Sequence, residues 1–541
     1  MTINATATAT ATLPTLLRDR AAQIGSEVYV EDTDDRSLTY RAAVEWMDRW
    51  TGAWRAAGVE RGDHVVTMQF NTLESLAGWL GLASLGAVEA AINTDYRGDL
   101  LAHVLETTQA RTMLLDRQYV PRVSELAADL KHLRRLIVLG EAGGTAEVPF
   151  EIISMDDFLA AGGPAGELIE PAPWDVAAVL FTSGTTGPSK AVRMPWAQLH
   201  ATATGSMPLA DLGPEDVFFN AGPTYHLGAK SFPFTAALVG GRHIMRPFPS
   251  LAKQPEEYRK HGVTTCFFPP MQWLDEPERP DDADCALRNL LLPLPIPRMD
   301  EFKRRFGCRT YSVYSMTELS CPIADTDWNI GRINSGGLFS CGVVRQGYPG
   351  YEARIVDEWD QPVEPGVVGE LIVRTSAPWT VNAGYLNNPE ATAAAWRNGW
   401  FHTADAFSRD EDGYFYFRDR IKDCIRRRAE NISSFEVESY ARKNPHVADC
   451  AAVAHKLGAE AGADEEIRLF VVPAAGADLS PEVLALWLIP RMPRFMVPRF
   501  IEFVDALPQT PTMKVQKAVL RARPLAASAW DRERAGVEVP R

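Results

Sequence analysis

One stretch of the chain gathers hydroxyl side chains, glycines and a lysine in a pattern that suits phosphate binding. The segment FTSGTTGPSKAV spans residues 181–192 and follows a short apolar run. Backbone N–H groups of a glycine-rich loop can surround phosphate oxygens, hydroxyls add donors, and a lysine adds positive charge. The residues concerned are Thr182, Ser183, Thr185, Thr186 and Lys190, with Gly184 and Gly187 allowing close backbone approach. The segment predicts a phosphate-binding loop, although such a loop taken alone is equally typical of a surface connection.

This loop differs from the Walker A motif of nucleotide hydrolases. That motif reads G-x-x-x-x-G-K-[ST], whereas here Ser189 precedes Lys190 and Ala191 follows it. The preceding segment VAAVLFT, residues 176–182, has the composition of a buried strand. Because ligand-binding loops of open α/β sheets lie at strand ends, this placement favours a functional role for the loop.

Strands and helices alternate along the N-terminal part of the chain, from about residue 26 to residue 140. This alternation predicts a doubly wound α/β layer with a largely parallel sheet. The expected strands are 64–70, 88–93, 112–116 and 176–182, and the expected helices are 72–86 and a segment that starts near Asp99.

The rest of the chain changes character twice. Residues 343–380 contain short β-type runs, and a turn-rich, charged segment follows them. A small α/β unit comes next, with helices expected at 433–443 and 481–489 and strands at 450–456, 467–473 and 500–505. We therefore predict an α/β protein with a large multi-lobed N-terminal domain, which includes a β-rich lobe, and a small mobile α+β C-terminal domain. The predicted bounds are a disordered tail at 1–14, the large domain at 15–420 and the small domain at 421–541.

Composition argues against several classes of function. The 541 residues include 55 Lys and Arg and 70 Asp and Glu, and the net charge of −15 disfavours bulk attraction to nucleic acid or to an anionic membrane. The 7 cysteines are scattered without a CxxC pair, which is typical of reduced thiols and not of a disulfide framework or a zinc site. No apolar run is long enough to span a bilayer, and the Thr/Ala-rich N-terminus lacks the features of a secretion signal. We expect a cytoplasmic protein.

The loop and seven further motifs, in order along the chain, resemble those of the acyl-adenylate-forming superfamily. This superfamily includes acyl- and aryl-CoA synthetases, peptide-synthetase adenylation domains and luciferases, and its loop runs approximately [YF]TSGTTG-x-PKGV. The further motifs are LGAVEAAINTDYRGDLL (85–101), PTYHLG (223–228), YSMTE (314–318), GELIVRT (369–375) with GYLNNPEAT (384–392), GWFHTADAF (399–407), DRIKDCIRRRAENISSFEVE (419–438) and LPQTPTMKVQKAVLR (507–521). The first of these looks most like bacterial carnitine/crotonobetaine-type acyl-CoA ligases. One match is weak, but seven in order are specific.

The resemblance implies an ATP-dependent reaction. Members activate a carboxylic acid with ATP and Mg²⁺ as an acyl adenylate, and the CoA ligases then transfer the acyl group to coenzyme A as a thioester. The loop from Thr182 to Lys190 would hold the triphosphate. Glu318 would coordinate Mg²⁺, and Thr317 would contact the α-phosphate.

Other motif residues would bind the rest of the nucleotide. By resemblance, Tyr314 stacks on adenine, and Asp405 and Arg420 bind the ribose hydroxyls. Lys514 would reach the carboxylate of the acid and the α-phosphate at the adenylation step. Taken alone, each of these residues could also have an ordinary structural role. Lys514 and Glu318 could be solvated surface charges, and Asp405 could cap a helix.

The resemblance also implies sites for domain rotation, for CoA and for the acid. Lys422 stands at the hinge about which the small domain rotates between the half-reactions, although RIKDCIRRR is also a plain basic surface run. The CoA tunnel would include Ala429, Glu430 and Asn431, and the acyl pocket would include Tyr225, His226, Phe268 and Gly337. His226 would lie near the tunnel, or it is an ordinary core histidine. The pocket segments supply aromatic, apolar and small residues, which favours a mostly apolar organic acid.

Several glycines of the family are replaced in this chain. The replacements are Ala191, Leu291, Ser315, Ala404, Ala429 and Met513. A Cβ atom costs little where φ is negative, but it obstructs a positive φ or a close backbone approach. The chemical groups of the family are thus present while the steric frame around them is altered.

Three functions stay open from the sequence. The first is a complete acid–CoA ligase. The second is an enzyme that makes only the thioester, from an acyl adenylate supplied by a separate adenylating partner, because Leu291 and Ser315 bear on the nucleotide pocket. The third is a catalytically silent nucleotide-binding homologue, which the retention of Lys514 and Glu318 disfavours. A homodimer is also left open.

Overall fold

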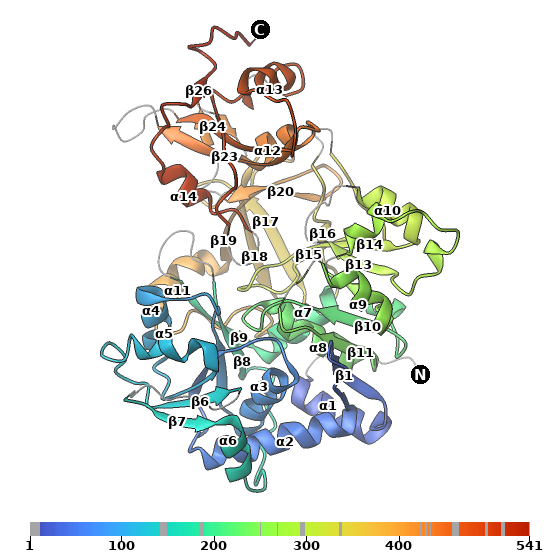
Figure 1. Cartoon of the computed structure of the whole chain (residues 1–541), viewed down its shortest axis with the longest axis vertical. Helices are drawn as coiled ribbons and strands as arrows, with labels where there is room; N and C mark the ends of the chain where they lie inside the picture. The colour runs from blue at the N-terminus through green and yellow to red at the C-terminus, as the bar shows by residue number, and fades with distance from the viewer. Residues whose placement is uncertain are drawn as a thin grey trace. The chain divides into compact units, whose positions relative to one another are not determined.

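The computed structural model describes most of the chain and places it in two compact units (Figure 1). The described residues are 11–140, 149–182, 189–248, 250, 252–267, 269–292, 298–334, 338–420, 425–427, 430–432, 434–456, 465–492, 496–509 and 514–539. Unit 1 comprises Met1–Ile333, Phe339–Ala353 and Val373–Phe401, and unit 2 comprises Asn334–Leu338, Arg354–Ile372 and His402–Arg541.

Unit 1 contains a seven-stranded sheet with the order β7-β6-β5-β3-β4-β8-β9. Its strands are β3 (His64–Met68), β4 (Val88–Ala91), β5 (Thr112–Asp116), β6 (Arg135–Leu139), β7 (Glu151–Ser154), β8 (Val176–Phe181) and β9 (Ala191–Pro195). All neighbours run parallel except β8 and β9. The predicted largely parallel sheet is confirmed, and β9 is antiparallel because the connection from β8 is too short for a crossover.

A nine-stranded sheet forms the second layer of unit 1, in the order β16-β15-β14-β13-β12-β10-β11-β1-β2. Its strands are β1 (Val28–Asp32), β2 (Ser37–Thr39), β10 (Val217–Asn220), β11 (Arg242–Met245), β12 (Thr265–Cys266), β13 (Asn289–Leu292), β14 (Arg309–Tyr314), β15 (Ile323–Ala324) and β16 (Val343–Val344). The central pairs are parallel, and the antiparallel pairs lie at the two edges.

Helix α3 (Leu73–Leu85) fits between these two sheets because nearly all of its residues are apolar. Thr72 and Ser75 form a capping box at its start, and Gly86 ends it with φ +77°. The helix packs against β4 of the first sheet and β1 of the second. The predicted helix at 72–86 is therefore confirmed, and its caps explain why its ends could be read from the sequence.

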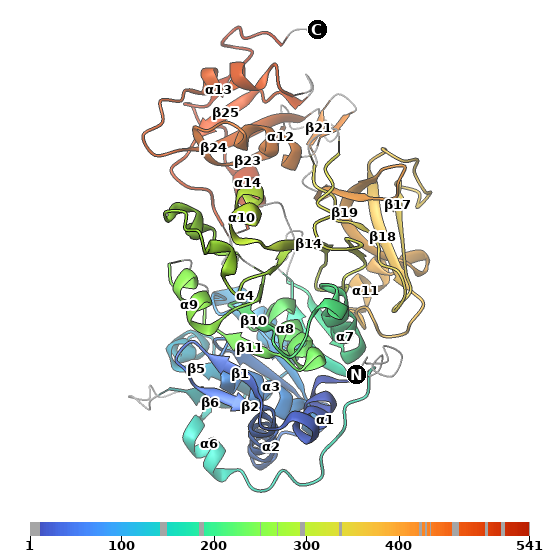
Figure 2. The same cartoon turned by 90° about the vertical axis from the view of Figure 1, so that its right-hand side faces the viewer.

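The other helices of unit 1 cover the two sheets, with α1, α2 and α3 packed side by side (Figure 2). They are α1 (Leu13–Ile24), α2 (Tyr40–Ala56), α4 (Gly98–Thr108), α5 (Val120–Ser124), α6 (Met155–Ala161), α7 (Trp196–Gly205), α8 (Leu227–Val239), α9 (Gln254–His261), α10 (Met299–Phe306) and α11 (Pro389–Ala395). Short 3₁₀ turns are η1 (Arg117–Tyr119), η2 (Leu209–Asp211), η3 (Met271–Asp275), η4 (Asp282–Asp284) and η5 (Arg397–Gly399). Leu13 and Pro14, which the predicted tail included, lie buried in α1.

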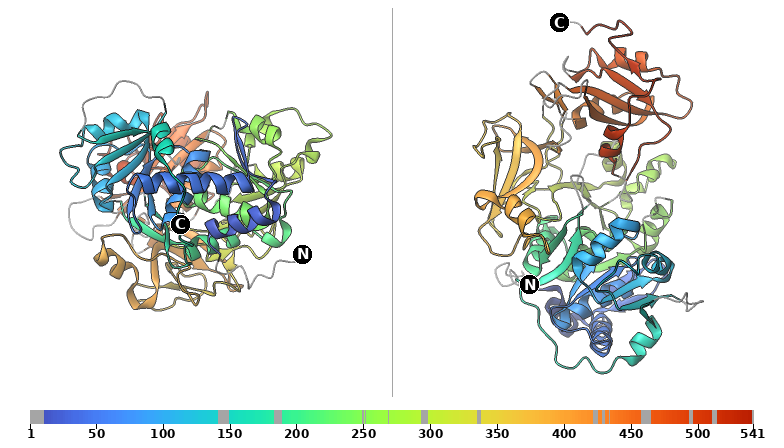
Figure 3. Two further views of the ribbon diagram at one scale, coloured as in Figure 1. Left: turned by 90° about the horizontal axis from the view of Figure 1, so that it is seen from below. Right: turned by 90° about the vertical axis from the view of Figure 1, so that its left-hand side faces the viewer.

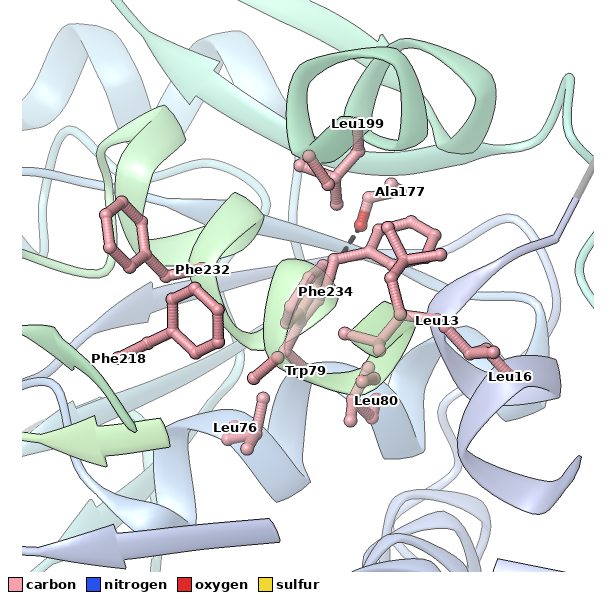
Figure 4. Packing of buried hydrophobic residues seen from close by; sticks show 14 of the residues in the cluster. Leu13, Leu16, Leu76, Trp79, Leu80, Ala177, Leu199, Phe218, Phe232 and Phe234 are labelled. Atoms are coloured by element: carbon pink, nitrogen blue, oxygen red, sulfur yellow. Dashed lines mark hydrogen bonds between the residues drawn. The ribbon is translucent and has the colours of Figure 1, made fainter. Parts of the chain in front are cut away.

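The core between the two sheets is built around Trp79 of α3 (Figure 4). The Trp79 indole N–H donates to the Ala177 carbonyl at 2.7 Å, which satisfies its polar group inside the core. The Trp79 ring stacks on Trp196 with centroids 5.4 Å apart. Phe218 and Phe232 pack edge to face at 6.4 Å in the same cluster, so helix α8 is held against strand β10.

Strands β17 (Tyr351–Val356), β18 (Gly369–Thr375), β19 (Phe401–Arg409) and β20 (Phe415–Arg420) form a sheet in that order, and the division between the units passes through it. The C-terminal part of unit 2 folds as a separate small α/β layer, drawn in orange and red in Figure 3. It contains β21 (Ile425–Arg427), β22 (Glu430–Ile432), α12 (Ser434–Arg442), β23 (Val447–Lys456), β24 (Glu465–Pro473), α13 (Pro481–Leu488), β25 (Phe500–Phe503), α14 (Lys517–Ala522) and β26 (Trp530–Asp531). No helix within the described residues has the length and apolarity needed to cross a membrane.

Candidate functional site

The two ends of the predicted phosphate loop are hydrogen-bonded to each other. Strands β8 and β9 pair so that Phe181 faces Ala191. The Thr182 N–H donates to the Lys190 carbonyl at 3.0 Å, and the Ser189 hydroxyl donates to the Thr182 carbonyl. The structure thus brings Thr182 and Lys190 together at the base of the loop. Ser183, Gly184, Thr185, Thr186 and Gly187 lie outside the described residues.

A cavity of about 330 Å³ lies beside Lys190 in unit 1. Its lining includes His103 and Thr107 of α4 and Asn387, which precedes α11. His103 Nε2 lies 3.1 Å from the Ser189 carbonyl oxygen, and the Asn387 side-chain amide donates to the Thr107 carbonyl at 2.8 Å. These contacts connect α4 and the Asn387 segment to the end of the loop, and the cavity that they border is lined by both the Lys190 ammonium and the Glu106 carboxylate.

Of the predicted nucleotide residues, Tyr314 is the last residue of strand β14, and Thr317 and Glu318 follow shortly after it. The Thr317 carbonyl accepts a hydrogen bond of 2.9 Å from the Gln198 side chain. Glu318 is only 7% exposed, and its backbone carbonyl accepts from the N–H and the side-chain amide of Asn382 at 3.0 and 2.9 Å. Because a buried carboxylate requires donors or a cation, the environment of Glu318 fits a Mg²⁺ ligand.

Tyr385 connects Glu318 with the phosphate loop, and sequence reasoning gave it no role. Its hydroxyl donates to Glu318 Oε1 at 3.1 Å. The Nζ atom of Lys190 lies 5.0 Å from the centroid of the Tyr385 ring. The signal available in the sequence was the position of this tyrosine in the GYLNNPEAT motif.

Tyr225 and His226 lie side by side at the start of helix α8, with ring centroids 4.8 Å apart. His226 is the residue before the helix and has extended backbone angles. Burial raises the pKa of Tyr225 to about 12, so its hydroxyl stays protonated at neutral pH. One helical turn and a half further on, Phe232 packs against Phe267 at 6.5 Å. The other predicted acyl-pocket residues, Phe268 and Gly337, lie outside the described residues.

In unit 2, Asp405 and Arg420 are directly opposite each other on strands β19 and β20. Asp405 is buried, and its N–H donates to the Thr403 hydroxyl at 3.1 Å. Ala404, at a glycine position of the family, has φ +55°, and its N–H donates to Glu370 Oε1 at 2.9 Å. Ala404 therefore has a left-handed backbone conformation, which glycine adopts readily and which disfavours a residue with a Cβ atom.

Lys514 is exposed in the connection between β25 and α14 of unit 2. Gln509 and Val515 form an antiparallel bridge across this segment, and the Gln516 N–H donates to the Pro508 carbonyl at 2.7 Å. Glu430 and Asn431 lie in β22, with side chains that are not described. The predicted residues Lys422, Ala429 and Met513 lie outside the described residues, as does the side chain of Arg420.

Three other glycine replacements lie among the described residues, and their backbone conformation accepts a Cβ atom. Ala191, Leu291 and Ser315 are not among the described residues with positive φ. Leu291 is buried in the cluster between the two sheets, together with Tyr311 and Val313. Within the described residues nothing favours a protein that makes only the thioester.

Two family models match the chain. One, described as AMP-binding enzyme, matches residues 17–386, and the other, described as AMP-binding enzyme C-terminal domain, matches residues 436–514. The crotonobetaine/carnitine–CoA ligases of Salmonella enteritidis PT4 and of Salmonella typhi are each 30% identical to the chain over 501 residues. These alignments cover 90% of this chain and 93% of each relative.

Three solved structures illustrate the similarity in fold, and two of them are described as CoA ligases. An anthranilate CoA ligase, AuaEII, in complex with anthranoyl-AMP superposes with a TM-score of 0.81 at 21% identity, covering 95% of this chain and 97% of that one. ATP-bound MatB from Rhodopseudomonas palustris gives 0.79 at 22% identity, with 94% and 98% covered. A benzoate CoA ligase from Burkholderia xenovorans LB400 gives 0.78 at 23% identity, with 94% and 100% covered.

Proposed function

The chain belongs to the AMP-binding enzyme family, and from this membership we propose that it is an AMP-forming acid–CoA ligase for a mostly apolar carboxylic acid. The observation that carries the proposal is that Lys190, at the end of the phosphate loop, and the buried Glu318 both contact Tyr385, Lys190 at the ring face and Glu318 at the hydroxyl. A silent homologue has no need of a cation and a buried carboxylate at this place.

The reaction has two steps. A carboxylate oxygen of the acid attacks the α-phosphorus of ATP, the bond from this phosphorus to the bridging oxygen breaks, and pyrophosphate leaves. The thiolate of coenzyme A then attacks the acyl carbon, and AMP leaves with the electron pair of the broken carbon–oxygen bond. Mg²⁺, when bound, neutralises charge on the phosphate oxygens. The protein must therefore supply oriented donors and cations in the first step.

Residues of unit 1 serve the triphosphate in this proposal. The loop that starts at Thr182 binds the phosphates through backbone N–H groups and hydroxyls, and Lys190 adds a positive charge at its end. Glu318 holds Mg²⁺ through carboxylate oxygen, and Thr317 contacts the α-phosphate. Tyr314 offers its ring face to adenine.

Residues of unit 2 have roles in nucleotide binding and in acyl transfer in this proposal. Asp405 accepts hydrogen bonds from the ribose hydroxyls, with Arg420 beside it on the neighbouring strand. Lys514 binds the carboxylate of the acid and the α-phosphate during adenylation. We place the boundary of the rotating small domain near Arg420, with Lys422 as the hinge. Residues 429–431 and His226 would line the path of the CoA thiol.

The class of acid is inferred from the side chains around His226. Leu227, Phe232 and Phe267 belong to the segments predicted for the acyl pocket and are all apolar, and Phe232 packs against Phe267 at 6.5 Å. Lys230 of α8 is charged, but its ammonium is already paired with the Glu89 carboxylate. An acid with a mostly apolar body fits segments of this composition better than one with a second ionic group.

A two-part assay on the purified protein tests the proposal. In the first part, ATP, Mg²⁺ and a panel of aromatic, aliphatic and quaternary ammonium acids are supplied, and pyrophosphate release is followed with and without CoA. In the second part, a synthetic acyl adenylate and CoA are supplied, and the thioester is measured. We expect pyrophosphate and acyl-CoA in the first part with an apolar acid.

The other outcomes reject the proposal or part of it. Thioester in the second part alone would mean that ATP is not used and that a separate adenylating partner supplies the acyl adenylate. No product in either part would mean a silent homologue. A clear preference for a quaternary ammonium acid would reject the apolar class while leaving the ligase reaction intact.

The location and assembly of the protein are also proposals. Cys266, Cys308, Cys321 and Cys450 are buried thiols, which supports a reducing, cytoplasmic location. Its partners in this scheme are the acid, ATP and CoA. A homodimer would be detected by light scattering of the purified chain.

A further inference from the structure

A short segment of unit 1, residues 382–386, runs beside the outgoing strand of the phosphate loop. Tyr385 forms an antiparallel bridge with Val192 of β9. The Leu386 N–H donates to the Ala191 carbonyl at 2.8 Å, and the Arg193 N–H donates to the Gly384 carbonyl at 3.0 Å. The segment therefore adds an extended edge to β9 directly next to the end of the loop.

The same segment also holds Glu318. Asn382 donates to the Glu318 carbonyl from both its N–H and its side-chain amide. The Tyr385 hydroxyl donates to the Glu318 carboxylate at 3.1 Å, and both side chains are 7% exposed. A second contact fixes Tyr385 itself, since its N–H donates to the Thr392 hydroxyl at 2.9 Å. Residues 382–386 thus hold both the backbone and the side chain of Glu318 by hydrogen bonds.

The face of the Tyr385 ring is directed to a cation. Lys190 Nζ lies 5.0 Å from the ring centroid, within the range of a cation–π interaction. A lysine and a carboxylate at the same site would be expected to pair with each other, which would neutralise both. Among the described residues, the recorded contact of the Lys190 ammonium is with the Tyr385 ring, and no ion pair of Lys190 is recorded. The aromatic ring and its hydroxyl instead give each charged group a separate neutral partner.

We propose that Tyr385 is a positioning residue for adenylation, which fixes the Glu318 carboxylate for the metal–nucleotide complex and keeps the Lys190 ammonium available to phosphate oxygens. This inference rests on the proposed function, because it assigns Glu318 and Lys190 to the phosphates of ATP. Tyr385 acts through these two residues and makes no bond to a reacting atom. Its loss should therefore impair adenylation and spare the transfer of a preformed acyl group to CoA.

Two variants separate the two contacts of this tyrosine. Tyr385→Phe removes the hydroxyl and keeps the ring over Lys190, whereas Tyr385→Leu removes both. Tyr40→Phe is the matched control, because the buried Tyr40 hydroxyl donates to the backbone carbonyls of Ala236 and Gly241 at a distance from this site in the sequence and fold. Thermal unfolding of each protein checks that it is folded.

The first readout is metal binding without turnover. Mn²⁺ is titrated into protein with α,β-methylene-ATP and followed by electron paramagnetic resonance. We expect Tyr385→Phe to weaken Mn²⁺ binding about tenfold, as for other residues that orient a metal ligand. Tyr385→Leu should weaken binding further, and Tyr40→Phe should match the wild type.

The second readout is the split between the half-reactions. Both Tyr385 variants should lose at least about tenfold in pyrophosphate release, while thioester formation from synthetic acyl adenylate stays within about twofold of the wild type. Wild-type Mn²⁺ affinity in Tyr385→Phe, or equal loss in both half-reactions, would overturn the inference for Tyr385 alone. Failure of the wild-type protein to bind the Mn²⁺–nucleotide complex would overturn the proposed function and this inference together.

Discussion

Lys230 and Glu89 form an ion pair that is almost completely buried in unit 1. The exposed fractions of their side chains are 4% and 0%, and the Thr67 hydroxyl also donates to Glu89 at 2.9 Å. The Lys230 ammonium lies 4.3 Å from the Trp79 ring centroid. Burial lowers the pKa of Lys230, and the charge of Glu89 opposes this shift. The pair joins helix α8, which begins beside His226, to strand β4.

We predict that breaking this pair destabilises the protein strongly. Glu89→Gln leaves a buried ammonium without its counter-charge, which costs about 3–5 kcal/mol. The double variant Glu89→Gln/Lys230→Met removes both charges and should recover most of this loss. Urea titrations followed by tryptophan fluorescence measure the free energies of unfolding. The single variant Lys230→Met completes the cycle, and if the loss of stability in the double variant equals the sum of the losses in Glu89→Gln and Lys230→Met, the coupling between the charges is absent.

Replacing Ala404 with glycine should stabilise the protein. Ala404 has φ +55°, where the strain from a Cβ atom costs about 1–2 kcal/mol. Glycine removes this strain, but it also increases the conformational entropy of the unfolded chain, which offsets part of the gain in stability. We expect Ala404→Gly to raise the free energy of unfolding by about 1 kcal/mol. The matched control is Ala406→Gly, two residues further along β19, where φ is not positive and the side chain is buried. That variant should lose stability, and a gain in both would contradict the strain argument.

Elements with local signals were predictable from the sequence. Thr72 and Gly86 mark the two ends of α3, and the apolar run between them fixes its type. The alternation of strands and helices predicted the parallel sheet because each crossover needs a helix. The pairing of β1 with β11 was not predicted, since it joins segments far apart in the chain and depends on burial that no local pattern encodes.

The site shows the same division. The motifs predicted Glu318 and Lys190 as site residues, but they did not predict that both contact Tyr385. That contact depends on the pairing of residues 382–386 with β9, which forms only in the folded chain. The glycine replacements were all visible as well. Only the backbone angles separate Ala404, which is left-handed, from Leu291 and Ser315, which are not.

The stability of unit 1 should depend on pH through His243. His243 is fully buried in β11, and burial lowers its pKa from 6.5 to about 3. The folded protein therefore keeps this ring neutral, while the unfolded chain binds a proton as the pH falls below 6.5. The stability from this group is complete above pH 6.5 and decreases as the pH falls towards 3.

We expect His243 to account for a loss of about 2 kcal/mol between pH 7 and pH 5. The variant His243→Asn carries no titrating group and should show a pH dependence that is weaker by this amount. Urea titrations of both proteins at the two pH values measure the difference. Burial raises the pKa of Asp116 to about 6, so this group acts in the opposite direction in both proteins and cancels in the comparison. Equal pH dependence in the two proteins would contradict the prediction.

Lys514 and Lys517 lie three positions apart and should respond in opposite ways to the same change. Lys514 is exposed, whereas Lys517 forms an ion pair of 2.8 Å with the buried Glu438 and also donates to the Ser434 hydroxyl. Ser434 in turn donates its N–H to Asp419 at 2.8 Å, so Lys517 belongs to a buried polar network at the start of α12.

We predict that Lys514→Met lowers pyrophosphate release at least about a hundredfold, because it removes the cation at the α-phosphate, and changes stability by less than about 0.5 kcal/mol. Lys517→Met should keep the adenylation chemistry of the folded protein but cost about 2 kcal/mol, since it leaves Glu438 and Ser434 with fewer partners in a buried place. Each variant is measured for pyrophosphate release, for thioester formation from synthetic acyl adenylate, and for unfolding in urea. Lys514→Met should retain thioester formation, which shows that only one step is lost. The assignment of Lys514 to adenylation fails if both half-reactions fall together, or if Lys517→Met at full folding shows the same selective loss.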